Sequence, residues 1–137
     1  MAAYKLSFIN NRSISAETKG ALRTLRTQVE EARKAYDAMT AKVAKLTAGY
    51  EPSEDASDDE LLEFEEALVR TESNYGIPQL GKAVVDAEAK LAAAAIMAMM
   101  ESRIVKVAEG RAMAKAVKTN VVQARQLADA ALAMNLR

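Results

Sequence analysis

The sequence predicts an all-α protein: an elongated helical hairpin or bundle of three or four helices with coiled-coil seams and a short extended N-terminal arm. Strong helix formers dominate its 137 residues, with 29 alanines among them. Five glycines and two prolines leave long stretches without a helix breaker. Apolar residues also recur with alternating spacings of three and four over residues 22–50, which is the heptad rhythm of a coiled coil.

Residues 1–14 break the helical pattern and are expected to form the extended arm. Tyr4, Leu6 and Phe8 alternate with polar residues, and a period of two is typical of a strand. No second strand candidate follows in the sequence, so a strand here needs a pairing partner from another chain or another copy. The alternative is a loose tail that lays Leu6 and Phe8 on the helices.

Residues 15–137 are predicted to form a single helical domain whose first helix covers residues 15–48. Ser13 or Ser15 can cap its start, and Gly49 and Pro52 end it. Nine positions of this helix and its end form the heptad seam: Leu22, Leu25, Val29, Ala32, Tyr36, Met39, Val43, Leu46 and Tyr50.

The second predicted helix covers residues 58–74 and is acidic. Ser57 and Glu60 match a capping box at its start, where the helix dipole also favours acidic residues. Its apolar stripe includes Leu61, Phe64 and Leu68. We expect the self-assembly or partner interface to use this stripe, the arm and the heptad seam, through Tyr4, Leu6, Phe8, Leu22, Leu25, Val29, Tyr36, Met39, Val43, Leu46, Leu61, Phe64 and Leu68.

The third predicted helix covers residues 80–135, a stretch with one internal glycine beyond its start and no proline. A continuous or gently kinked rod is favoured, with Gly110 as the candidate break point. The heptad spacing returns at Val117, Val121, Ala124, Ala128 and Ala131. Three clustered methionines, Met97, Met99 and Met100, suit either a core filler or an adaptable binding surface.

Charge is segregated along the chain although the net charge is zero. Residues 51–75 hold ten acidic residues and one basic residue, whereas the segments on either side carry +5 and +4. This separation indicates charge pairing within the fold or head-to-tail between copies.

No constellation for catalysis or metal binding is visible. The chain has no His, Cys or Trp, which disfavours ordinary zinc, haem and copper sites. Residues 76–82 match the G-x-x-x-x-G-K pattern of a phosphate-binding loop, but Ala83 replaces the Ser or Thr that holds magnesium, and no strand precedes the match. The acidic run at 54–60 lacks the register of a calcium loop. We therefore expect no enzyme activity, no cofactor and no small-molecule substrate.

Nucleic acid and membrane are disfavoured as partners. On one continuous helix, Arg103, Arg111, Lys115, Lys118 and Arg125 would form a basic stripe that suits phosphates. The chain after Tyr75 lacks aromatic residues for base stacking. The longest apolar run, 91–100, is half the length of about 20 residues that spans a bilayer, and no signal peptide is visible. The expected location is the cytoplasm or an assembled virion or particle.

The expected function is that of a non-enzymatic structural protein, the helical subunit of a larger homomeric complex such as a phage-like virion component, a filament or an appendage. Alanine seams bury little area per residue, so a lone monomer should be marginally stable and gain from oligomerisation. The alternative is a soluble helical adaptor or chaperone that binds a segment of a partner protein. No motif assigns the chain to a family.

Overall fold

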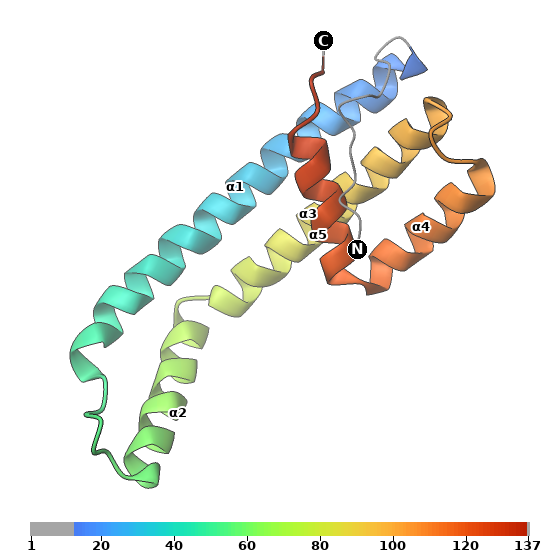
Figure 1. Ribbon diagram of the computed structural model, residues 1–137. Coiled ribbons are helices and arrows are strands. Elements are labelled where there is room, and N and C mark those ends of the chain that lie inside the picture. Colours follow the sequence, from blue (N-terminus) through green and yellow to red (C-terminus); the bar gives the residue numbers. More distant parts are fainter. Residues whose placement is uncertain (1–12, 137) are drawn as a thin grey trace. The chain divides into compact units, whose positions relative to one another are not determined.

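The computed structural model describes residues 13–136, and within that range every regular element is a helix and no strand occurs. Five α-helices follow one another: α1 (Ala16–Thr47), α2 (Asp58–Asn74), α3 (Ile77–Glu101), α4 (Val107–Thr119) and α5 (Val121–Leu132) (Figure 1). A short 3-10 turn, η2 (Ala48–Tyr50), extends α1. The all-α prediction is confirmed. The strand proposed for Tyr4, Leu6 and Phe8 lies outside the described residues.

The helices form two compact units. Among the described residues, unit 1 comprises 13–31 and 84–136, and unit 2 comprises Ala32–Ala83. The first half of α1, most of α3, and both α4 and α5 therefore belong to unit 1. The second half of α1, all of α2 and the first turns of α3 belong to unit 2.

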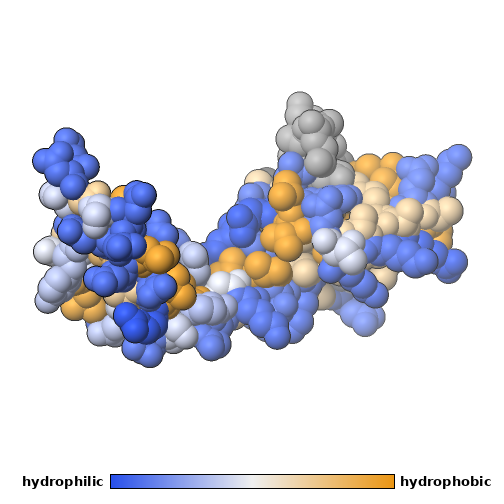
Figure 2. Space-filling model, turned by 90° about the horizontal axis from the view of Figure 1, so that it is seen from below, coloured by the Kyte–Doolittle hydropathy of each residue, from blue (hydrophilic) through white to orange (hydrophobic). Residues whose placement is uncertain are grey.

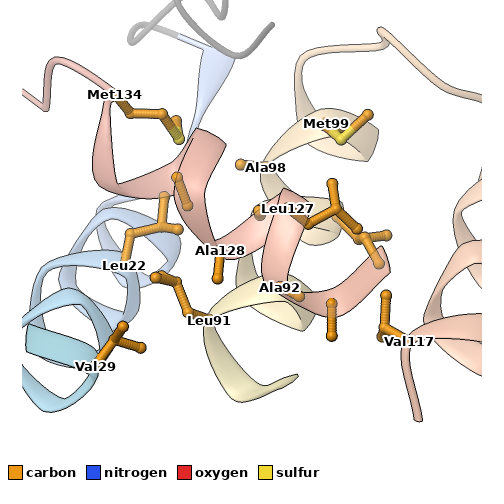
Figure 3. Close-up of a cluster of buried hydrophobic side chains, with 14 of the residues drawn as sticks. Leu22, Val29, Leu91, Ala92, Ala98, Met99, Val117, Leu127, Ala128 and Met134 are labelled. Atoms are coloured by element: carbon orange, nitrogen blue, oxygen red, sulfur yellow. The ribbon is translucent and has the colours of Figure 1, made fainter. Parts of the chain in front are cut away.

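Unit 1 contains the principal hydrophobic core. Leu22 from α1, Leu91 from α3 and Leu127 from α5 are fully buried, and Figure 3 draws all three within one cluster of buried side chains. Full burial of one such side chain stabilises a fold by about 1.5–3 kcal/mol. Ile14, which the sequence placed at the end of the arm, is also buried in this core.

Alanines let the helices of unit 1 approach closely. The buried alanines of the core are Ala92, Ala95, Ala98, Ala124, Ala128 and Ala131. The first three lie on α3 and the other three on α5, and a methyl group in place of a longer chain brings two backbones together. Arg26 of α1 adds a polar link, because its Nη1 and Nη2 donate to the carbonyl oxygens of Met134 (3.2 Å) and Leu132 (3.0 Å) at the end of α5.

The caps of the first two helices agree with the sequence. Ser15 precedes α1, and its hydroxyl accepts from the Thr18 amide at 3.1 Å. Ser57 precedes α2 and accepts from the Glu60 amide at 3.2 Å. Each side-chain oxygen satisfies an amide that has no partner within the helix.

The predicted helix 80–135 is in fact three helices. Breaks occur at residues 102–106 and at Asn120, whereas Gly110 lies inside α4. At the first break Arg103 adopts a left-handed conformation with φ 59°, and the Ile104 amide donates back to the Met99 carbonyl at 2.9 Å. At the second, the Asn120 side chain caps α5 by accepting from the Gln123 amide at 3.0 Å.

Gly110 allows close packing and does not end a helix. It is buried, and a Cβ atom at this position would overlap the side chain of Met100 near the end of α3. The glycine therefore allows the start of α4 to lie directly against that methionine.

An ion pair in unit 1 links a buried carboxylate to a partly exposed arginine. Glu88 of α3 is 1% exposed, and its Oε2 lies 3.2 Å from Nε of Arg125 on α5. The Arg125 side chain itself is about half exposed, so the pair joins the interior to the surface. A buried charge is tolerated when it is paired and hydrogen-bonded.

Unit 2 has a thin core. Its buried hydrophobic residues are Val43 of α1 and Ile77 of α3, and α2 buries none. Around them Tyr36 lies against Gly81, and the Lys42 ammonium sits 5.2 Å from the centre of the Tyr75 ring. Gly76, with φ 73°, makes the tight turn between α2 and α3 that only glycine adopts without strain.

Replacing Gly110 with alanine should destabilise the protein, whereas Gly20→Ala should stabilise it. Both glycines lie within helices, where alanine is favoured by about 1 kcal/mol, but only Gly110 has a neighbour in the way. Overpacking costs about 1–3 kcal/mol. Urea unfolding should separate the two variants by about 2 kcal/mol. Equal stability would show that Met100 does not restrict this site.

Arg125→Met should cost about 1–3 kcal/mol, because it removes the ion pair between Arg125 and the buried Glu88 carboxylate. The double variant Glu88→Leu/Arg125→Met should return to within about 1 kcal/mol of the parent. Thermal unfolding measures both, with the exposed Arg23→Met as control. If the double variant is no more stable than Arg125→Met, the cost does not come from the loss of this ion pair.

Candidate protein-binding site

Unit 1 carries an open groove between α1 and α3. Its volume is about 610 Å³, and five of its ten lining residues are apolar. The lining residues are Ser15, Glu17, Thr18, Ala21, Leu25, Lys90, Ala93, Ala94, Met97 and Glu101. Met97 is about half exposed at its edge. An apolar channel of this kind suits a segment of protein better than a polar substrate.

Glu101 closes one end of the groove and holds the start of α1. Its Oε2 accepts from the Ser15 amide at 3.0 Å, and its Oε1 accepts from the hydroxyls of Thr18 (2.7 Å) and Ser15 (3.1 Å). A carboxylate at a helix N-terminus is stabilised by free amides and by the helix dipole. Glu101 therefore fixes the end of α3 to the beginning of α1.

The surroundings of Glu101 lower the pKa of its carboxyl group below the ordinary value of 4.5. Burial acts in the opposite direction and raises the pKa, but the hydrogen bonds from Thr18 and Ser15 outweigh it. The carboxylate is consequently charged at neutral pH, and it accepts hydrogen bonds from Ser15 and Thr18 at the start of α1. Its role in the described structure is to position α1.

A second surface is the outward face of α2 in unit 2. Leu62 and Val69 lie two turns apart, and they are 54% and 65% exposed. Helical spacing places carboxylates on either side of them. We call this surface the acidic face of α2 and define it as Asp58, Asp59, Leu62, Glu65, Glu66 and Val69, all of which are exposed.

A third surface lies on α4 in unit 1. Arg111, Lys115 and Lys118 are exposed along one side of this helix, and exposed Val107 begins the same side. We call these four residues the basic stripe of α4. Figure 2 shows hydrophobic surface residues among hydrophilic ones on the face that it draws.

The longer basic stripe predicted from one continuous helix is wrong. Arg103 lies in the break before α4, and Arg125 lies on α5, where it pairs with Glu88. Arg111, Lys115 and Lys118 remain together because they share α4. A surface of three cations without an aromatic side chain offers less to nucleic acid than the predicted five-residue stripe.

The residues predicted for an interface are divided between core and surface. Leu22 and Val29 are buried in the core of unit 1, with Leu25 packed against it, and Val43 is buried in unit 2. The half-buried positions are Tyr36, Met39, Phe64 and Leu68. Leu46 and Leu61 are 45% and 43% exposed. The first positions of the heptad seam are therefore buried, whereas its last positions are exposed, and Tyr50 is 78% exposed.

The residues that match the phosphate-loop pattern do not form a loop. Residues 77–83 form the first turns of α3, so their backbone amides do not form a cradle. Within residues 13–136 no group of three or more carboxylates is arranged to hold a metal ion. In the same range no helix is long and apolar enough to cross a membrane.

Sequence reasoning missed the Glu101 cap and the exposed aliphatic residues next to the helix breaks. Ile104, Val107, Val121 and Val122 are each more than 40% exposed. Asn120 followed by Gln123 resembles a capping box and could have revealed the second break. The Ser15–Glu101 contact joins residues 86 positions apart, and no local pattern indicates it.

Comparison of the chain with models of protein families, with curated proteins and with solved structures finds no match.

Glu101→Gln should destabilise the protein by about 1 kcal/mol at pH 7, because a neutral amide holds the α1 cap less strongly. The pKa of Glu101 is lowered in the folded state. The stability that its carboxylate adds is therefore complete above pH 4.5 and is lost as the pH falls through the folded-state pKa. The stability difference between parent and variant should therefore shrink below about pH 4.5. Urea unfolding from pH 7 to pH 3 measures it, with exposed Glu31→Gln as control. A constant difference would argue against a charged cap.

Proposed function

We propose that the chain is a non-enzymatic structural subunit that completes its hydrophobic packing in a homomeric assembly, such as a virion component, a filament or an appendage. The observation that carries this proposal is the thin core of unit 2. This unit has 52 residues but buries only two hydrophobic side chains, Val43 and Ile77. A unit of this size with so little buried area is marginal without a partner.

Unit 2 exposes apolar side chains that such a partner would cover. Leu61, Leu62 and Val69 of α2 are each more than 40% exposed, and α2 has no buried residue. Leu46 and Tyr50 continue the heptad seam of α1 into solvent. A coiled-coil contact between copies through this end of the seam belongs to the proposal.

A helical adaptor that binds a segment of another protein is the second candidate. The α1–α3 groove in unit 1 favours it, because this groove is open, lined largely by small and apolar side chains, and about 610 Å³ in volume. An adaptor of this kind would remain small alone and gain stability from its partner.

Light scattering on the purified chain should show a species much larger than 14.8 kDa at micromolar concentration, and the mass should fall in high salt. Deletion of residues 1–9 tests whether the arm contributes and should lower the mass if it does. Hydrogen exchange should show slower exchange in α2 as the protein concentration rises, because assembly covers its exposed face. A 14.8 kDa monomer at every concentration and salt, with unchanged exchange in α2, would contradict the assembly proposal and favour the adaptor.

A further inference from the structure

The same chain carries two exposed surfaces of opposite charge, each with aliphatic side chains. On α2, Leu62 and Val69 lie between Asp58 and Glu65 on one side and Asp59 and Glu66 on the other. On α4, Val107 begins a row that continues with three cations. Residues 51–75 carry −9, whereas residues 103–118 contain five basic residues and one acidic residue.

The two surfaces also share a spacing. Leu62 and Val69 are seven residues apart, as are Glu65 and Asp58, and Arg111 and Lys118 repeat the same interval on α4. Seven helical residues span about 10 Å, so two helices lying side by side can repeat a contact in register. The α2 helix of 17 residues is long enough to receive the whole of α4, which has 13.

We infer that the acidic face of α2 in one copy docks on the basic stripe of α4 in another copy of the chain. This inference rests on the proposed homomeric assembly and names the contact that builds it. Carboxylates of Glu65 and Glu66 would pair with Arg111 and Lys115, while Val107 would cover part of the apolar row on α2. Opposite potentials on the two faces steer the correct surfaces together and oppose the pairing of like surfaces.

The contact is heterologous, because it joins two different surfaces. Every copy then offers its acidic face to one neighbour and its basic stripe to another. Such a contact generates a ring if the rotation between copies closes, and an open helical filament if it does not. Isologous pairing of two acidic faces would bring like charges together and is disfavoured.

Charge reversal tests the contact. Glu65→Lys/Glu66→Lys and Arg111→Glu/Lys115→Glu should each raise the protein concentration needed for assembly by at least about tenfold, because each brings like charges together. A 1:1 mixture of the two variants should assemble again, as should the chain that carries all four changes. Glu30→Lys/Glu31→Lys, at two adjacent exposed glutamates of α1, is the matched control and should assemble as the parent does.

Disulfide trapping gives an independent measurement, because the parent chain has no cysteine. A mixture of Glu66→Cys and Lys115→Cys chains should form a cross-linked dimer faster than Glu66→Cys mixed with exposed Lys34→Cys. Circular dichroism checks that every variant keeps its helix content.

The outcomes separate the two proposals. A parent that assembles while the reversed variants assemble equally well would overturn the α2–α4 contact and leave the homomeric assembly standing. Loss of assembly in the Glu30/Glu31 control as well would also overturn it, because the effect would then follow overall charge. A parent that never assembles would overturn the proposed function itself.

Discussion

The close packing of alanine-bearing helices in unit 1 is the constraint on which the rest of the structure depends. Alanines of α3 and α5 keep the two backbones near enough for Leu22, Leu91 and Leu127 to share one core. The breaks at residues 102–106 and at Asn120 fold the C-terminal third of the chain back on itself, which allows α5 to reach this core. A larger side chain at Ala92 or Ala128, which are both fully buried, would overpack this core at a cost of about 1–3 kcal/mol.

Much of the fold was predictable, because local signals determine it. Composition identified the helical class, and Ser15 and Ser57 marked the starts of the first two helices. The breaks in the C-terminal region were not foreseen because glycine, the usual sign of a break, is misleading here. Gly110 is required by the approach of Met100, while the left-handed residue that ends α3 is Arg103. Local hydrogen bonds from the Arg103 and Ile104 amides to the carbonyls of Met100 and Met99 stabilise a backbone conformation that arginine rarely adopts.

The candidate surfaces were predictable only in part. The acidic character of α2 and the segregation of charge are visible in the sequence, and they are the basis of the proposed α2–α4 contact. The distribution of the heptad seam between core and surface is not visible, because the same spacing predicts Leu22 and Leu46 equally. Only the fold shows that Leu22 is fully covered within this chain while Leu46 is left 45% exposed.

The division of the chain has a consequence for its biosynthesis. In the sequence, unit 2 is inserted between the two segments of unit 1. The core of unit 1 therefore cannot form completely before α5 has been synthesised. The hydrogen bonds of Arg26 to Leu132 and Met134 join residues more than 100 positions apart. Synthesis must therefore pass α5 before Leu22 is fully covered. Until then α1 exposes an apolar side, and the nascent chain depends on its solubility or on a chaperone to avoid premature association.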